Sequence, residues 1–355
     1  GILMRTLLIL AAALLLTSCS DSNDSTASTP EPAPPPEPTY ELSAEIKRTE
    51  YGIPHIVAED WKSLGYGFGY AYSQDNYCVA MREMVYASGR SAELLGEEQG
   101  NTGSDFLFRY LNGDDAEFEE LFVNQLPEFS RDLTAGFARG MNRYREETGD
   151  DNLAEGDYGC RDAPWLFEVT PIDLFKHMRR EALRGSSDNG TFRNALLSVE
   201  GPADAGATGS LNDAQLADFS NSAAAAARGM HNFDRGSNAL AVGSESTQNG
   251  GAVLLGNPHQ PWFGAGAWYQ AHLTLPGEYD VAGAALHGFP FIGIGFNKDV
   301  AWTHTVSLAN RFSLYELKLN PENPLEDQYE DEMREITPVE VTIDVLLADD
   351  TLEQQ

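Results

Sequence analysis

The distribution of apolar residues changes abruptly across residues 201–236, and this change is the strongest constraint on the fold. The stretch GPADAGATGSLNDAQLADFSNSAAAAARGMHNFDRG is rich in Ala, Gly, Asp and Ser and holds only scattered large apolar side chains. Apolar residues recur with helical spacing before this stretch, and in short runs bounded by turn residues after it. A helical segment and a strand-rich segment joined by such a spacer predict an α+β protein with two functional segments.

Residues 40–200 carry the helical pattern. Two short alternating runs flank Tyr51-Gly52 and predict a β-hairpin at the start of this segment. Helices are predicted over residues 63–89, after Pro127, and from the N-cap pair Thr170-Pro171 to near Gly185. The tyrosines and methionines between Tyr66 and Met84 recur at helical spacing and indicate helix packing.

Residues 237–355 carry the strand pattern. Strands are predicted over residues 238–242, 252–255, 268–275, 281–286, 291–296 and 300–306, with a turn at Asn297-Lys298-Asp299. The last residues, LADDTLEQQ, stop without an evident domain closure. We therefore expect the chain to be incomplete at its C-terminus.

Acidic residues outnumber basic ones by a wide margin. The 355 residues include 23 Lys and Arg against 55 Asp and Glu, for a formal net charge of −32. Such a surface repels phosphate backbones, so nucleic acid is not an expected partner. The charge suits an exported protein in salty surroundings, although a merely well-solvated surface accounts for it equally well.

The start of the chain has the layout of an export signal. Arg5 precedes an apolar run from Leu7 to Leu16, which is too short to span a bilayer as a mature helix. The ending L-T-S-C resembles a bacterial lipobox, which implies cleavage before Cys19 and a lipid attached to that cysteine. A plain signal peptide over residues 1–19 is the alternative. We expect an exported bacterial protein, periplasmic or held at the outer membrane by a lipid anchor on Cys19.

The segment after the signal has little to bury. Residues 20–39, SDSNDSTASTPEPAPPPEPT, are Ser, Pro and acidic residues. This composition predicts a disordered or polyproline-like tether. Such a tether would hold a folded body away from a membrane.

Two cysteines remain in the body of the chain, Cys78 and Cys160. In an oxidising compartment an isolated pair can form a disulfide. Two buried thiols are the alternative, and the sequence leaves both open.

Ser237 lies directly after the spacer, in the stretch FDRGSNALAV. A serine hydroxyl is a weak nucleophile unless a base removes its proton, and no G-x-S-x-G elbow surrounds this serine. A serine at a new N-terminus carries its own base, because an α-amine has a pKa of about 7.7–8.0. That chemistry requires cleavage of the Gly236–Ser237 bond, and glycine permits the strained backbone that cleavage needs. Taken alone, a serine in this context is more often an ordinary turn or strand-edge residue.

The residues around Ser237 resemble a known family. The stretch GSNALAVGSESTQNGGAVLLGNPHQPW, followed by WYQAHLTLPGEYDVAGAALHGFPFIGIGFNKDVAWTHTV, is similar to the start of the β subunit of the penicillin acylase family. Upstream, IKRTEYGIPHIVAED, LGYGFGYAYSQDNYC and SGRSAEL resemble the family's α subunit. The likeness covers roughly residues 44–306 apart from the spacer, and is greatest to the acyl-homoserine lactone and aculeacin acylases. It implies the αββα fold of N-terminal nucleophile hydrolases.

The resemblance implies roles for three residues of the strand-rich segment. Ser237 matches the nucleophile that autocatalytic cleavage after Gly236 exposes, with its own α-amine as general base. His259, in GNPHQPW, matches a histidine that bonds near this amine. Val306, in WTHTV, matches the residue whose backbone N–H forms half of the oxyanion hole. The family's other oxyanion donor, an asparagine, would lie beyond the end of this sequence, so we expect the chain to be inactive alone.

Gln260, Phe289 and Trp302 match positions of the family's acyl pocket. Relatives usually place a large apolar residue at the position of Gln260, so a polar side chain there weakens the expectation of a long acyl chain. Phe289, in HGFPF, keeps an aromatic wall. Some penicillin acylases bind calcium, but SLANRFSLYEL has no acid before Glu316, and no two histidines have metal-ligand spacing. We therefore expect no cofactor and no metal.

The expected function is hydrolysis of an N-acyl amide through an acyl-Ser237 ester. The resemblance implies acyl-homoserine lactones or acylated peptides as small-molecule substrates, with penicillin- or cephalosporin-type side chains as the alternative within the class. After cleavage the α and β chains are expected to stay associated. A surface lipoprotein that keeps the fold without catalysis is the alternative from another class. A Ser-His-Asp hydrolase would need no cut after Gly236.

Overall fold

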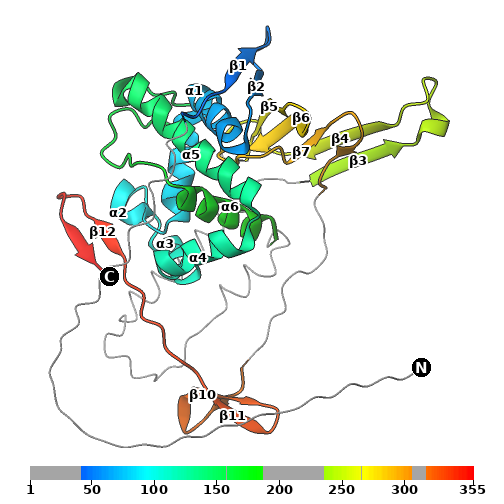
Figure 1. The fold of residues 1–355 in the computed structure, drawn as a ribbon. Helices are drawn as coiled ribbons and strands as arrows, with labels where there is room; N and C mark the ends of the chain where they lie inside the picture. Colours follow the sequence, from blue (N-terminus) through cyan, green and yellow to red (C-terminus); the bar gives the residue numbers. More distant parts are fainter. Residues whose placement is uncertain (1–40, 157, 187–235, 265, 306–316) are drawn as a thin grey trace, which may run out of the picture. The chain divides into compact units, whose positions relative to one another are not determined.

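The computed structural model of the protein describes residues 41–156, 158–186, 236–264, 266–305 and 317–355 (Figure 1). The expected signal sequence, Cys19, the tether, the spacer up to residue 235 and Val306 lie outside the described residues. Within the described part, no helix is both long and apolar enough to cross a bilayer.

A short hairpin begins the described chain, as the sequence predicts. β1 (Glu45–Arg48) pairs antiparallel with β2 (Pro54–Val57). Gly52 in the turn has φ +85°, a conformation that residues with a side chain rarely adopt. The Arg48 guanidinium donates to the Gly52 carbonyl at 2.7 Å and to Asp75 Oδ2 at 2.8 Å, which ties the hairpin to the first helix.

The two longest helices lie with their backbones nearly touching. α1 (Trp61–Ala87) and α5 (Glu128–Thr148) cover the helices predicted over residues 63–89 and after Pro127. Glycines that lie four residues apart on each helix make the contact: Gly65 and Gly69 on α1, and Gly136 and Gly140 on α5. A Cβ at Gly65 would lie 2.1 Å from the Leu133 carbonyl oxygen, and a Cβ at Gly140 would lie 2.1 Å from the Tyr66 carbonyl oxygen. Only glycine permits this approach.

Four further helices complete the helical segment: α2 (Ser91–Leu95), α3 (Thr102–Asn112), α4 (Asp115–Gln125) and α6 (Pro171–Ser186). α6 begins at the predicted Thr170-Pro171 pair, where Thr170 and Asp173 cap each other. The sequence did not predict the other three. The buried Asp105 carboxylate joins two of them, because it accepts from the backbone N–H of Ser91 at 2.9 Å and of Ala92 at 2.6 Å.

One mixed sheet combines strands from both sides of the spacer. Its order is β1-β2-β5-β6-β7-β8, with β5 (Trp268–Leu275), β6 (Tyr279–Leu286), β7 (Ile294–Phe296) and β8 (Ala301–Trp302). β2 runs parallel to β5, with His55 opposite His272, and the other neighbours are antiparallel. The helical and strand-rich segments are therefore joined through backbone hydrogen bonds, and the α+β class is confirmed.

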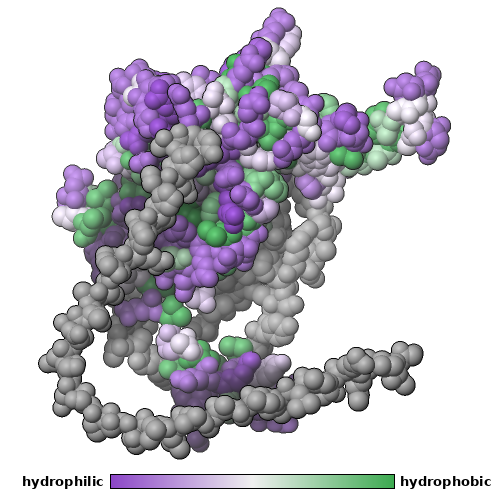
Figure 2. Space-filling view, in the orientation of Figure 1, coloured by the Kyte–Doolittle hydropathy of each residue, from purple (hydrophilic) through white to green (hydrophobic). Residues whose placement is uncertain are grey.

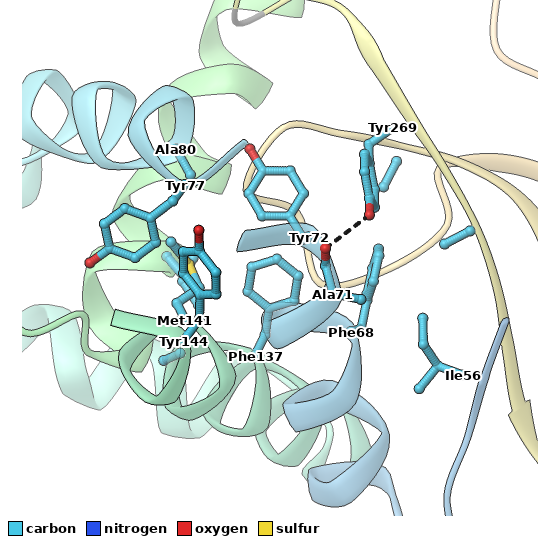
Figure 3. Close-up of a cluster of buried hydrophobic side chains, with 14 of the residues drawn as sticks. Ile56, Phe68, Ala71, Tyr72, Tyr77, Ala80, Phe137, Met141, Tyr144 and Tyr269 are labelled. Carbon is cyan, nitrogen blue, oxygen red and sulfur yellow. Dashed lines mark hydrogen bonds between the residues drawn. The ribbon is translucent and has the colours of Figure 1, made fainter. Parts of the chain in front are cut away.

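The core lies where α1 and α5 meet this sheet (Figure 3). Tyr72 and Phe137 are almost fully buried, with ring centroids 5.6 Å apart. Tyr269 of β5 meets Tyr72 edge-to-face and donates from its hydroxyl to the Ala71 carbonyl at 3.1 Å. Cys78 and Cys160 form a disulfide with a Cα–Cα distance of 5.4 Å, so the pair that the sequence left open is a bond within the helical segment.

The remaining strands form small separate sheets. β3 (Gly236–Val242) pairs with β4 (Val253–His259). β9 (Leu319–Asn320), β10 (Asn323–Tyr329) and β11 (Glu332–Glu335) form a second small sheet, and β12 (Asp344–Leu346) pairs with β13 (Leu352–Gln354). The strands after residue 317 were not predicted.

Two predicted strands are shorter than expected. The strand expected over residues 291–296 begins only at Ile294, because Pro290 has no N–H to donate to a ladder and the preceding residues form the turn from β6. The strand expected over residues 300–306 is the two-residue β8, as far as the described residues reach.

Candidate active site

The β3–β4 hairpin brings the two best sequence candidates together. In its antiparallel register Gly236 lies opposite His259, and Ser237 lies opposite Pro258. The hairpin folds because two apolar runs flank a polar turn that contains Asn249-Gly250. The strand pairing therefore brings together Ser237 and His259, which lie 22 positions apart in the sequence.

The Ser237 hydroxyl donates a hydrogen bond to the carbonyl oxygen of Gly236. This carbonyl belongs to the Gly236–Ser237 peptide bond, so the hydroxyl oxygen lies beside the bond that the sequence marks for cleavage. The residue is only partly buried. The hydroxyl group of Ser237 therefore lies next to the amide carbonyl of the residue that precedes it.

The His259 imidazole lies against the backbone of Gly236. A Cβ at position 236 would come within 2.9 Å of His259 Nδ1, so a larger residue there would displace the imidazole from its present position. The Asn238 side-chain amide lies 3.1 Å from His259 Nε2, with the amide nitrogen as donor. Accepting that bond places the ring proton of a neutral imidazole on Nδ1, the nitrogen that faces Gly236.

Asn238 is a site residue that the sequence interpretation missed. It follows Ser237 directly and reaches the histidine because both lie near the same end of the strand pair. Its position beside Ser237 is a sequence signal, but the contact to His259 depends on a register that composition does not reveal.

The three proposed pocket residues lie at three different places in the strand-rich segment. Gln260 follows the end of β4 and is half-buried. Phe289 lies in the turn between β6 and β7, and Trp302 lies in β8, where its indole N–H donates to the Gly293 carbonyl at 2.9 Å. Phe289 and Trp302 both pack against the main core.

The hairpin lies close to the end of the six-stranded sheet. A Cβ at Gly256 of β4 would lie 2.9 Å from Thr303 Oγ1, directly after β8. The chain leading toward Val306 therefore passes next to the hairpin. Val306 itself, the expected oxyanion donor, is outside the described residues.

Several apolar side chains of the hairpin are exposed. Leu240, Val253 and Leu255 lie on the solvent side, and Figure 2 shows apolar atoms along this element. His272 Nδ1 lies 2.9 Å from His55 Nδ1, and His272 Nε2 lies 2.7 Å from Asp280 Oδ1. Across the described ranges, no group of three or more His, Cys, Asp or Glu residues is arranged to hold a metal ion.

Two buried side chains of the helical segment hold the turn that carries Phe289. The Tyr72 hydroxyl lies 3.0 Å from His287 Nδ1, and His177 Nε2 lies 2.8 Å from the His287 carbonyl oxygen. Burial raises the pKa of Tyr72 and lowers the pKa of His177, so both side chains are neutral at neutral pH. Neither was singled out from the sequence, where each looks like one more residue of a helix stripe.

Comparison with known proteins shows the family of this chain. Residues 43–355 match the penicillin amidase family. The acyl-homoserine lactone acylase PvdQ of Pseudomonas fluorescens Pf0-1 is 40% identical over 321 residues, which cover 88% of this chain and 39% of that relative. The aculeacin-A acylase of Actinoplanes utahensis is 36% identical over 310 residues, or 84% of this chain and 38% of that relative.

The chain thus spans about two-fifths of the length of these curated relatives. Among solved structures, a thermostable penicillin G acylase from Alcaligenes faecalis is 24% identical, with a TM-score of 0.35 over 50% of this chain and 90% of that one. The family match covers nearly the whole described body and includes both sides of the spacer. The chain belongs to the penicillin amidase family.

Proposed function

We propose that the protein is an amide hydrolase whose precursor cleaves itself between Gly236 and Ser237. The single observation that carries this proposal is the convergence of the Ser237 hydroxyl, the Gly236 carbonyl and the His259 ring at one end of the β3–β4 pair. An ordinary serine at a strand edge would not require a histidine ring beside the residue that precedes it.

Self-cleavage uses the hydroxyl that already lies beside the scissile carbonyl. Ser237 Oγ attacks the Gly236 carbonyl carbon and the C–N bond breaks. The hydroxyl proton is transferred to the nitrogen, which leaves as the new α-amine of Ser237. Water then hydrolyses the resulting ester, which leaves a carboxylate on Gly236 and a free hydroxyl on Ser237. His259 Nδ1, which faces Gly236 and carries the ring proton in this tautomer, is placed to donate a proton toward the bond that breaks.

In turnover the α-amine of Ser237 acts as general base. It takes the hydroxyl proton as Oγ attacks the substrate carbonyl, and then gives the proton to the leaving amine. The acyl-Ser237 ester is hydrolysed by water in the second half of the cycle. The backbone N–H of Val306 is the proposed oxyanion donor, a type of contact worth about 3–4 kcal/mol in the transition state.

The proposed substrates are lipophilic N-acyl amides. The two relatives quoted above are named as acylases of acyl-homoserine lactones and of aculeacin A. The reaction that we propose likewise removes an N-acyl group. Gln260, Phe289 and Trp302 would line the acyl pocket, with the amide of Gln260 favouring a shorter or more polar acyl chain. Side chains of the penicillin type are the second candidate, because the family is named for them.

The proposal extends to the fold and the location of the mature protein. The two chains would remain joined after the cut, because β2 and β5 pair within one sheet and Tyr269 bonds to Ala71 and Asp75. We propose the αββα arrangement of N-terminal nucleophile hydrolases for the complete protein. Export, with a lipid on Cys19 and residues 20–39 as the tether, would place it in the periplasm or at the outer membrane.

N-terminal sequencing of the full-length gene product tests the mechanism. We expect a chain that begins at Ser237, and release of homoserine lactone or of another amine from N-acyl substrates. Ser237→Ala should abolish both the cut and turnover. An intact polypeptide in the active protein would refute the mechanism and favour a Ser-His-Asp hydrolase, whereas an intact and inactive protein would favour a binding lipoprotein.

A further inference from the structure

The turn that presents Phe289 is held from outside the strand-rich segment. It follows β6 and is closed by a hydrogen bond from Phe289 N–H to the Leu286 carbonyl at 3.1 Å. Two side chains from the other side of the cleavage site reach it, Tyr72 of α1 and His177 of α6. After cleavage, these contacts would connect two separate chains.

The chemistry of the His177 contact defines the orientation of its ring. The partner is a backbone carbonyl oxygen, which only accepts, so His177 Nε2 must carry the proton and donate. Nδ1 is then the unprotonated nitrogen, and it is buried with no hydrogen-bond partner among the described residues. Burial lowers the pKa of this histidine, against the opposing effect of Glu181 and Glu83. The ring is held neutral and in one tautomer.

The same ring forms a wall for Phe289. The two ring centroids are 5.5 Å apart, with an interplanar angle of 79°, an edge-to-face contact. Phe289 also contacts Phe291 at 5.4 Å and remains only partly buried. His177 therefore covers one edge of Phe289 and leaves another part of the phenyl ring open.

Gly288 lets the backbone of the turn pack closely against α6 and α1. Its φ is +73°, and a Cβ there would lie 3.1 Å from His177 Cδ2 and 3.4 Å from the Ala80 Cβ. The backbone of the turn thus lies directly on α6 and α1. A small movement of the His177 ring must move the turn, because close-packed interiors transmit displacement.

We infer that His177 is a positioning residue that sets the depth of the acyl pocket through its contacts to the His287–Phe289 turn. This inference rests on the proposed function, in which Phe289 lines that pocket. The hydrogen bond to the His287 carbonyl fixes the distance between the turn and α6. The ring contact fixes the orientation of the Phe289 side chain. The residue that tunes acyl-chain preference then lies on the α chain, whereas the nucleophile lies on the β chain.

Two substitutions separate the two contacts. His177→Gln keeps an amide donor for the His287 carbonyl and removes the aromatic wall, whereas His177→Phe keeps a ring and removes the donor. His55→Gln is the matched control, because His55 also bridges the two segments but bonds to His272 and has no contact with the turn.

The first readout is amide hydrogen exchange of the turn in the processed full-length protein. We expect faster exchange at the Phe289 N–H in His177→Phe, less change in His177→Gln, and none in the His55 control. Unchanged exchange in His177→Phe would overturn the inference, whatever the enzyme hydrolyses.

The second readout is kcat/KM for a series of N-acyl homoserine lactones from hexanoyl to dodecanoyl. We expect His177→Gln to change the ratio between long and short chains by about tenfold, through KM, because pocket depth acts on acyl binding. An altered ratio in the His55 control, or an unaltered ratio in both His177 variants, would overturn the inference while leaving the proposed function standing. Absence of hydrolysis in the wild type would instead refute the proposed function, and the exchange result would then decide the positioning role alone.

Discussion

Gly236 and His259 lie opposite each other in the β3–β4 pair, so close that a methyl group on Gly236 would meet the imidazole at 2.9 Å. The contact joins the residue before the proposed nucleophile to the histidine that the family resemblance selects. The Asn238 side-chain amide donates to the other ring nitrogen at 3.1 Å, which favours this orientation of the imidazole. The cleavage site is thus shaped by a steric requirement as well as by chemical reactivity.

We predict that Gly236→Ala slows self-cleavage at least about tenfold, because a displacement of 1 Å in a reacting group can reduce rates by about a hundredfold. Gly243→Ala is the matched control. A Cβ there meets only the carboxylate end of Glu245, which is flexible and exposed. The conversion of precursor to two chains on denaturing gels measures both. Normal processing of Gly236→Ala would show that the contact with His259 is not needed for the cut.

The glycine contact between α1 and α5 predicts a large loss of stability for a very small substitution. Gly65→Ala places a methyl group 2.1 Å from the Leu133 carbonyl oxygen. Because this oxygen belongs to the backbone of α5, the clash cannot be relieved by rotating a side chain and must separate the two helices. We expect a loss of about 2–3 kcal/mol or more in unfolding free energy. Lys62→Ala, on the exposed side of α1, should change it by less than about 0.5 kcal/mol. Urea unfolding midpoints compare the two, and equal midpoints would contradict the close approach.

The disulfide predicts a particular pattern on gels. Cys78 and Cys160 both precede the cleavage site, so the bond lies within one chain and links no α chain to a β chain. The processed protein should therefore separate into two bands under denaturing conditions without reductant. A single band that needs reductant would contradict the pairing.

The same bond closes a long loop and should stabilise the helical segment. Its two residues are 82 positions apart in the sequence. Replacing both cysteines with alanine should lower stability by about 2–5 kcal/mol. Thermal unfolding of the purified variant measures the loss, with the reduced wild-type protein as the comparison.

Buried His177 predicts a loss of stability in mild acid. Burial lowers its pKa in the folded state below the unfolded value of about 6.5. Above that pH both states are neutral and the group has no effect. As the pH falls below it, the unfolded state binds a proton that the folded state does not, so stability falls by up to about 1.4 kcal/mol per pH unit.

His177→Gln should remove this part of the pH dependence. The charged groups that act on His177 are Glu83 of α1 and Glu181 and Arg180 of α6, and all three remain in the variant. Unfolding measured between pH 7 and pH 5 should therefore show a smaller slope for the variant than for the wild type. Equal slopes for the variant and the wild type would contradict this prediction. They would mean that His177 binds a proton as readily in the folded state as in the unfolded chain.

Local patterns predicted the elements whose signals are local. The hairpin around Gly52, the helices α1, α5 and α6, and strands β3, β5 and β6 follow from apolar periodicity, turn residues and caps within each stretch. Helices α2 to α4 were not predicted. α2 has only five residues and is held by Asp105, a residue outside it. The strands after residue 317 are also short, and their burial pattern is mostly exposed.

The proposed chemistry of Ser237 follows from sequence alone, because the proposed nucleophile, base and scissile bond all belong to adjacent atoms of the chain. The pairing of β2 with β5, more than 200 residues apart, could not, and neither could the placement of His177 against Phe289. Those contacts join residues with no common periodicity, and each is worth little until the rest of the core is packed. The sequence by itself determined that a glycine–serine bond stands between a helical and a strand-rich segment. Only the tertiary structure decided that the helical segment holds the aromatic turn beside the proposed pocket, because close packing across the core brings those side chains together.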